Sequence, residues 1–249
     1  MNSKKITRNY LESYFSKKGN VVLSKKRTKT CFLLLHGMGV LPDIYDNLVN
    51  YLSKNINSDF YIPIQRFSKN SNETSVKQDY KSWVKDGLSF YNKLNKYYDD
   101  VYLVGHSLGG SVAFNMSSQL KINNLILLST PLCVDKKILF SSKRNFNKTP
   151  FIIKFNIFVL IFKNYFLISK MKYNLLYCLG LNDETVSINS AKKIKSSKSN
   201  FNFVEIQYLE NCAHSEILRN KIFAKRISLE IIKFLKKKVF KKQSFKKQK

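Results

Sequence analysis

The chain has little cysteine, few acidic residues and only three histidines. Its four cysteines are scattered with no C-x-x-C pair, and this spacing argues against both a disulfide framework and a zinc site. Sixteen acidic residues stand against 44 Lys and Arg, a formal net charge of +28, which excludes an acidic solvating protein. The cysteines are Cys31, Cys133, Cys178 and Cys212.

A long charge-free apolar run is also missing. The most apolar stretch, Phe151–Lys170, contains Lys154, Lys163 and Lys170, whereas a membrane-spanning helix needs about 20 nearly charge-free residues. The first fifteen residues are basic, but no apolar run follows them, so no secretory signal is expected. These absences favour a cytoplasmic location.

The positive charge has two interpretations. Only six of the 44 basic residues are Arg and Asn is abundant, as expected from a general compositional preference for Lys and Asn. The alternative is a selected basic surface, with nucleic acid, an anionic membrane or an acidic partner as candidate targets. The tail 236–249 has eight Lys in fourteen residues, and we expect it to be solvated and disordered.

Apolar residues make up 44% of the 249 residues, enough for one domain with a sizeable core. From Lys29 onward, short apolar runs alternate with longer amphipathic ones, which predicts an α/β fold around a mostly parallel sheet with helices on both faces. The predicted strands are Cys31–Leu35, Phe60–Ile64, Val101–Val104, Leu125–Leu128, Leu175–Leu179 and Phe203–Tyr208. The predicted helices are Pro42–Lys54, Val76–Tyr97, Leu108–Leu120, Ser187–Ser197 and Ser215–Lys238.

The same alternation of apolar and amphipathic runs also predicts the organisation of the chain. Residues 1–28 are expected to form a basic N-terminal segment, 29–235 the domain and 236–249 the tail. Residues 133–172 are too long for a simple crossover and indicate a short cap insertion. Within it, Phe151, Phe155, Phe158 and Phe162 recur at helical spacing, so their shared face is expected to line an acyl pocket or to pack on the core.

The segment Val101–Gly110 contains G-x-S-x-G, with Ser107 at its centre. A buried strand is predicted to end at Val104 and a helix to begin at Leu108, which puts Ser107 on the turn between them. Glycines at 105 and 109 let strand and helix approach closely, and the helix N-terminus favours developing negative charge. Ser107 is therefore the candidate nucleophile.

A serine nucleophile needs a base. Of the three histidines, His106 is adjacent to Ser107 and leaves the turn in another direction, and His36 lies upstream of the nucleophile. The order nucleophile, acid, histidine expected for such a fold leaves His214, in a loop between the last strand and the last helix.

The acid that would orient this histidine lies between Ser107 and His214 in the sequence. Asp183 is the only Asp at the carboxyl end of an apolar strand, which makes it the preferred candidate. Glu184 could instead cap the following helix, and Glu210 is predicted to be a loop residue. The complete set of candidates is Asp135, Asp183, Glu184, Glu205 and Glu210.

Two backbone amides are expected to stabilise an oxyanion. One is the N–H of Leu108, directly after the nucleophile. The other should come from the glycine-containing loop after the first strong strand, where the Met38 N–H is the best candidate, although neighbouring amides could serve.

The segments LLLHGMG, GHSLGG, LNDETV and NCAHS together resemble the α/β-hydrolase superfamily, and most closely bacterial carboxylesterases and monoacylglycerol lipases. The resemblance covers about residues 29–235. It implies an α/β-hydrolase fold, a Ser107–Asp183–His214 triad, Met38 and Leu108 as oxyanion donors, and neither metal nor cofactor. The basic, Phe-rich insertion departs from the charged helical cap of many members and leaves the substrate open.

The expected function is hydrolysis of a carboxylic ester with a short to medium acyl chain, or of a monoacylglycerol, through an acyl-enzyme. One alternative is an acyl group carried by an acidic acyl carrier protein, with the Lys-rich surface as docking site. A second alternative is a non-catalytic basic binding protein on a hydrolase fold, with nucleic acid or an anionic membrane surface as its target. No motif with interleaved aromatic and basic residues points to specific nucleic acid binding.

Overall fold

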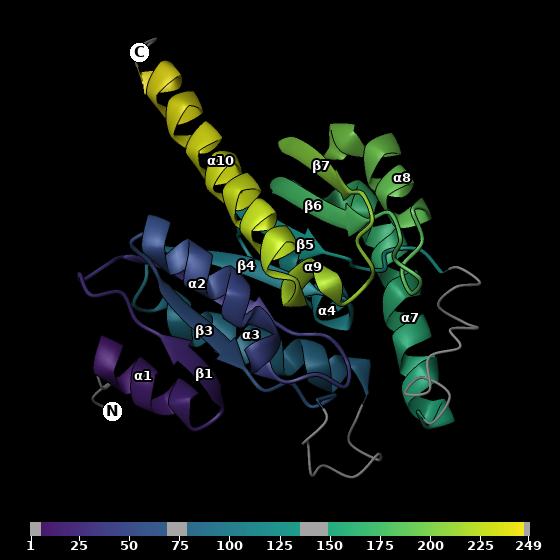
Figure 1. Ribbon diagram of the computed structural model, residues 1–249, viewed down its shortest axis with the longest axis horizontal. Coiled ribbons are helices and arrows are strands. Elements are labelled where there is room, and N and C mark those ends of the chain that lie inside the picture. The colour runs from purple at the N-terminus through teal and green to yellow at the C-terminus, as the bar shows by residue number, and fades with distance from the viewer. Residues whose placement is uncertain (1–5, 69–78, 135–148, 247–249) are drawn as a thin grey trace.

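The computed structural model describes residues 6–68, 79–134 and 149–246, with side chains up to Lys237. Its strands form one sheet in the order β1-β3-β2-β4-β5-β6-β7 (Figure 1). All neighbours pair in parallel except β1, which pairs antiparallel with β3 at one edge. The strands are β1 (Gly19–Val22), β2 (Thr30–Leu35), β3 (Asp59–Pro63), β4 (Asp100–His106), β5 (Asn124–Leu128), β6 (Asn174–Gly180) and β7 (Phe203–Leu209).

Helices cover both faces of the sheet because the central strands are buried on both sides. Along β2, Phe32 and Leu34 face one core, whereas Leu33 and Leu35 face the other. The first core is closed by the 3₁₀ turn η1 (Pro42–Tyr45), α2 (Asp46–Asn55), α9 (Glu216–Arg219) and α10 (Lys221–Lys246). The second is closed by α1 (Arg8–Ser16), α3 (Tyr80–Asn95), α4 (Leu108–Ser117), α7 (Phe151–Leu167) and α8 (Asn189–Ser196).

The predicted fold class is confirmed, and each predicted strand lies within two residues of an observed one. The predicted helix Pro42–Lys54 begins as the 3₁₀ turn η1, and Ser215–Lys238 is divided into α9 and α10. Residues 76–78 of the predicted helix Val76–Tyr97 lie outside the described residues, and α3 begins at Tyr80.

The boundary predicted at residue 29 is wrong, because part of the segment 1–28 belongs to the domain. Strand β1 completes the sheet edge beside β3, and helix α1 buries Leu11 and Phe15 completely. Arg8 of α1 donates a hydrogen bond to the fully buried Asp59 at the start of β3, with 2.7 Å between Nε and Oδ2. The α1–β1 unit is thus fastened by apolar contacts and by a buried ion pair.

The prediction of a disordered tail from residue 236 is also corrected, since α10 continues to Lys246 and residues 247–249 lie outside the described part. Ile231 and Phe234 anchor the preceding turns in the core. Lys237 then forms an ion pair with Glu205 of β7, at 2.8 Å between Nζ and Oε2. Lysine is a good helix former, so the helix does not end where the lysine-rich sequence begins.

The insertion predicted at 133–172 lies between β5 and β6 and contributes α7 and the 3₁₀ turn η3 (Ile168–Lys170); residues 135–148 are outside the described part. The phenylalanines of α7 that were expected to line an acyl pocket or to pack on the core are largely exposed, and Phe158 and Phe162 also line a groove between α3, α4 and α7. Phe151, Phe155 and Phe162 have half or more of their side-chain surface exposed, and Phe158 is 37% exposed. The opposite face of α7 packs against α3 and α4.

Candidate active site

Ser107 occupies a strained turn between β4 and α4, with φ 54° and ψ −125°. A residue with a side chain rarely adopts this region, and the surrounding glycines explain how Ser107 is held there. A Cβ on Gly105 would lie 2.4 Å from the Gly110 Cα, and one on Gly109 would lie 2.3 Å from the carbonyl oxygens of Leu35 and His36. Only glycine therefore allows β4, α4 and the end of β2 to meet behind Ser107.

His214 stands opposite Ser107, at 2.9 Å between Nε2 and Oγ, across 107 residues of sequence. It is buried in the loop between β7 and α9. Gly180 at the end of β6 allows this loop to approach, because a Cβ there would lie 2.2 Å from the Cys212 carbonyl oxygen. The carboxyl ends of β4 and β6 and the loop after β7 thus converge on one point.

Asp183 completes the arrangement from the loop after β6. Its Oδ2 lies 2.8 Å from Nδ1 of His214, and its Oδ1 accepts the amide N–H groups of Thr185 and Val186 at 2.9 and 2.7 Å. Burial alone would raise the pKa of Asp183, but the hydrogen bond from His214 and those two amides hold it below its usual value. The carboxylate stays ionised, and as an acceptor it fixes the proton of His214 on Nδ1.

The structure places the other acidic candidates elsewhere. Glu184 accepts the backbone N–H of His214 at 3.2 Å, so it holds the loop rather than the imidazole. Glu205 pairs with Lys237, and Glu210 is exposed. Asp135 lies outside the described residues.

The remaining two histidines, His36 and His106, are buried and make other contacts. His36 lies with Nδ1 2.9 Å from the Gly37 carbonyl oxygen and with Nε2 accepting the Gln65 N–H at 3.0 Å. Burial lowers the pKa of His36 to about 4. Burial is the main cause that lowers the pKa of His106 to about 3, and the charge of the neighbouring His214 is the second cause. The centroids of these two rings lie 5.2 Å apart. Both rings are neutral at physiological pH.

The loop after β2 lies directly against Ser107. A Cβ on Gly37 would lie 2.9 Å from the Ser107 Cβ, and Gly39 takes a left-handed φ of 69°. The Gly39 N–H donates to the Phe67 carbonyl oxygen at 3.0 Å, which directs that amide away from Ser107. Met38 is half-buried between the two glycines, and Leu108 begins α4, where first-turn amides have no helical acceptor. The two predicted oxyanion donors therefore belong to segments that flank Ser107.

Sequence reasoning missed two positioning residues, His36 and Glu184. The first holds the loop after β2 to the loop after β3, and the second holds the His214 backbone. A histidine directly before a glycine, at the end of an otherwise apolar strand, is a signal that could have indicated the first. Glu184 carried no such signal, because its partner lies 30 residues away.

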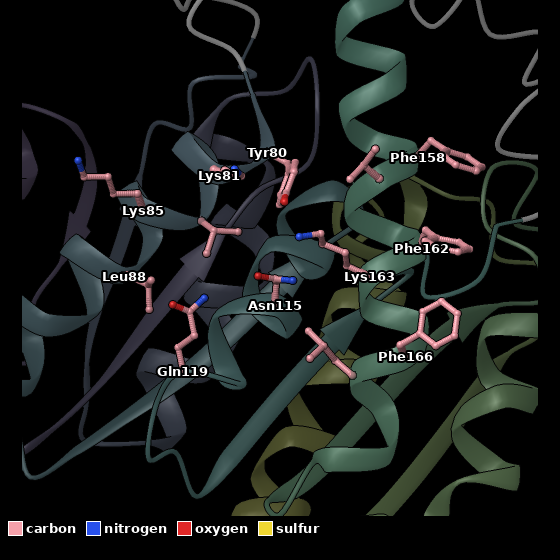
Figure 2. A pocket seen from close by; sticks show the side chains of 13 residues that line it. Tyr80, Lys81, Lys85, Leu88, Asn115, Gln119, Phe158, Phe162, Lys163 and Phe166 are labelled. Carbon is pink, nitrogen blue, oxygen red and sulfur yellow. The ribbon is translucent and has the colours of Figure 1, made fainter.

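One groove among the described residues lies away from Ser107. It has a volume of about 810 Å³ and lies between α3, α4 and α7 (Figure 2). None of Ser107, Asp183 and His214 lines it. Among the described residues, no group of three or more His, Cys, Asp or Glu side chains could hold a metal ion.

Comparison with known proteins agrees with this topology. The sequence profile of the alpha/beta hydrolase fold matches residues 30–152, a range that includes Ser107 and the loop after β2. A search of curated protein sequences finds no significant match.

Many solved structures share the fold at low sequence identity. A structure reported for the metagenome-derived lipolytic enzymes LipS and LipT superposes with a TM-score of 0.70 at 14% identity, covering 87% of this chain and 98% of the other. A lipase-esterase related protein from Clostridium acetobutylicum gives 0.68 at 16% identity, with 86% and 98% covered. A monoacylglycerol lipase from Paleococcus ferrophilus gives 0.63 at 14% identity, with 86% and 98% covered. With its parallel sheet, its strained strand–Ser107–helix turn and the matching profile, the chain has the α/β-hydrolase fold.

Proposed function

We propose that the protein is a serine hydrolase that cleaves a carboxylic ester through an acyl-enzyme. The observation that carries the proposal is the continuous chain of contacts from Ser107 Oγ to His214 Nε2 at 2.9 Å and from His214 Nδ1 to Asp183 Oδ2 at 2.8 Å. Nucleophile, base and orienting carboxylate are each within hydrogen-bond reach of the next.

In the acylation step, Ser107 Oγ attacks the ester carbonyl carbon while His214 Nε2 takes the hydroxyl proton. Asp183 remains ionised and stabilises the imidazolium without accepting its proton. Collapse of the tetrahedral intermediate breaks the bond to the alkoxy oxygen, and His214 returns the proton to the leaving alcohol. Water, deprotonated by His214, then attacks the acyl-enzyme, and the carboxylic acid is released as Ser107 regains its proton.

The negative charge of the intermediate would be met by the amides of Met38 and Leu108. Leu108 is the first residue of α4, whose N-terminus favours an anion. The loop that carries Met38 is held by the His36–Gly37 and Gly39–Phe67 contacts, so its amides need little reorganisation during the reaction.

The substrate class is inferred from proteins of the same fold. Solved structures of the same fold include proteins called lipolytic enzymes and a monoacylglycerol lipase. This likeness supports an ester with a short to medium acyl chain, or a monoacylglycerol, as the substrate.

Labelling with a fluorophosphonate probe tests the proposal. We expect the wild type to be labelled at Ser107 and to hydrolyse a p-nitrophenyl ester, and Ser107→Ala to lose both properties. His214→Ala should lower kcat by about 10⁴-fold or more, because the members of such a triad act as a unit. Ser118→Ala, an exposed serine at the other end of α4, is the matched control and should keep wild-type activity. Near-wild-type turnover by Ser107→Ala or His214→Ala would refute the assignment.

A further inference from the structure

Helix α7 has its polar side chains toward the protein and its aromatic side chains toward solvent. On the inner side, the Asn164 Nδ2 donates to the Ser111 carbonyl oxygen at 2.8 Å, and its Oδ1 accepts from Asn115 at 3.1 Å. The Asn156 Oδ1 accepts the Tyr80 N–H at 3.2 Å. These buried amides fix the rotation of α7 about its axis.

Six aromatic side chains occupy the outer side of α7, each 37% or more exposed. At 100° per residue they fall within an arc of roughly 100°, which we call the aromatic face. Neighbouring rings contact one another, with Phe158 and Phe162 centroids 6.1 Å apart and Phe162 and Phe166 centroids 5.0 Å apart. The members of the aromatic face are Phe151, Phe155, Phe158, Phe162, Tyr165 and Phe166.

An exposed continuous apolar surface of this kind is unusual unless something covers it. Figure 2 shows the rings of Phe158, Phe162 and Phe166 projecting from the side of α7 away from α3, while Lys163 points toward Asn115. By length and composition alone, Phe151–Lys170 could cross a membrane. Its inner face, however, is packed against α3 and α4 through hydrogen bonds of Asn156 and Asn164. This packing favours a helix that lies on the membrane surface over one that crosses the membrane.

The stretch of sequence that contains the aromatic face carries charges of one sign. Within the sequence, residues 136–182 contain nine Lys and Arg and no acidic residue. Lys154 and Lys163 lie on opposite flanks of the aromatic arc. The Lys163 ammonium stands over the Tyr80 ring, 5.0 Å from its centroid, so its long side chain would leave that ring to reach an anionic headgroup. On the neighbouring α3, Lys81 and Lys85 line the groove beside α7, and the only acidic residue of α3, Asp86, is paired with Arg66.

We propose that α7 is an interfacial helix that docks the protein on an anionic lipid surface, with the aromatic face inserted among the headgroups and the flanking lysines contacting lipid phosphates. Aromatic residues between cationic ones match the two layers of a lipid interface. An acidic protein partner would account for the lysines but not for six exposed rings. The proposal does not depend on the ester-hydrolase assignment, because it concerns binding alone.

Co-sedimentation with vesicles tests this docking. We expect the full chain to bind mixed vesicles made of equal parts phosphatidylcholine and phosphatidylglycerol. Its binding to vesicles of pure phosphatidylcholine should be much weaker. The triple variant Phe155→Ser/Phe158→Ser/Phe162→Ser should bind the anionic vesicles about tenfold or more weakly. The control variant Ile222→Ser/Leu229→Ser removes exposed apolar side chains of α10, on the other face of the sheet, and should bind as the wild type does.

An inserted reporter separates insertion from charge attraction. The Phe158→Trp variant should show a blue-shifted emission on adding anionic vesicles, whereas Ile222→Trp should not, and the native Trp83 is buried and gives a constant background. Unchanged melting temperatures would show that the serine variants remain folded. Three results would each overturn the proposal: retained vesicle binding by the triple variant, an unshifted emission of the Phe158→Trp variant, or a stable dimer whose formation alone shifts that emission.

Discussion

At the residue scale, the geometry around His214 depends on what kind of atom faces Nδ1. The Asp183 carboxylate offers only acceptors and is held in place by two backbone amides, so the ring must carry its proton on Nδ1 and present a lone pair at Nε2. An asparagine at this position would present an N–H as easily as an oxygen. His214 could then adopt the opposite tautomer, with its proton on Nε2. In that tautomer Nε2 has no lone pair to accept the Ser107 proton.

We therefore expect Asp183→Asn to lower kcat by about 10⁴-fold while the melting temperature changes little. Glu210→Gln, which alters an exposed carboxylate of the same strand–loop region, is the control and should keep wild-type kcat. Steady-state hydrolysis of a p-nitrophenyl ester measures both variants. The opposite ranking would transfer the role of the acid to Glu210 and contradict the observed loop geometry.

The two neutral histidines make a second prediction at this scale, concerning stability at acid pH. The unfolded chain protonates His36 and His106 near pH 6.5, whereas the folded protein does so only near pH 4 and pH 3 respectively. The unfolded state therefore binds more protons in this range, and stability falls as the pH falls below 6.5. Each extra proton costs about 1.4 kcal/mol per pH unit.

Urea unfolding between pH 6.5 and pH 4.5, a range above the usual carboxylate pKa values, measures this slope. His36→Gln should be less stable than the wild type at pH 6.5, because two hydrogen bonds to the loops are altered. Its stability should nevertheless fall less steeply with decreasing pH. An identical slope in wild type and variant would mean that His36 is already accessible to protons in the folded state.

The sequence was sufficient to predict which residues meet at Ser107. The G-x-S-x-G pattern, the small number of histidines and the single Asp at the end of an apolar strand left few choices, and the structure brings Ser107, His214 and Asp183 together. It was insufficient for the contacts made through the backbone. The hydrogen bonds of Glu184 and His36 to main-chain groups depend on loop conformation, which side-chain identity does not specify.

At the element scale, the α1–β1 unit shows how a polar contact can decide the boundary of a domain. Asp59 is completely buried, and it accepts hydrogen bonds from Arg8, from the Tyr98 hydroxyl at 2.6 Å and from the Ser24 N–H at 2.8 Å. The hydrogen bond to Asp59 raises the pKa of Arg8 above its usual value, so the guanidinium keeps its charge. Helix α1 therefore supplies the counter-charge that lets Asp59 begin β3.

Removing that charge should destabilise the fold. We expect Arg8→Met to lower the free energy of unfolding by about 3 kcal/mol, because Asp59 would remain buried without its cation. The control is Lys233→Met, which breaks the pair between Lys233 and Glu230 on α10, where the lysine side chain is 62% exposed; its effect should stay within about 0.5 kcal/mol. Urea denaturation measures both. Equal effects of the two variants would show that α1 contributes little to the stability of the domain.

The sequence predicted elements well where pattern alone decides them. The central strands are continuous apolar runs because helices cover both of their faces, and such runs are visible without tertiary information. β1 is a four-residue edge strand with alternating half-buried and exposed residues, too short to be distinguished from a loop. The rotation of α7 was unpredictable for another reason, since its apolar residues surround the whole helix. Its inward side is shown by the buried contacts of Asn156 and Asn164 and by the burial of Ile157, Leu160 and Ile161.

At the scale of the whole molecule, a net charge of +28 does not distinguish a selected surface from a compositional preference. The arrangement of the charges is more informative. The stretch 136–182 lacks any acidic residue and includes the aromatic face, whereas elsewhere lysines such as Lys233 and Lys237 have acidic partners. The charge separation alone would suit an anionic lipid surface or an acidic acyl carrier protein, and our proposal of lipid rests on the exposed rings of the aromatic face.

Salt dependence tests this distinction. The attraction between exposed charges weakens as the screening length falls from about 10 Å at 0.1 M to about 3 Å at 1 M salt. Hydrolysis of a small neutral ester involves no charged partner, so its kcat/KM should be nearly constant over this range.

If the basic surface docks lipid and not a carrier protein, kcat/KM should show the same flat salt dependence when the same acyl group is attached to an acyl carrier protein. Deletion of Lys236–Lys249 should leave kcat/KM on both substrates unchanged. A steep fall with salt on the carrier-bound substrate alone would instead show that the lysines recognise an acidic carrier. That result would make the carrier, and not a free ester or a lipid, the natural source of the acyl group.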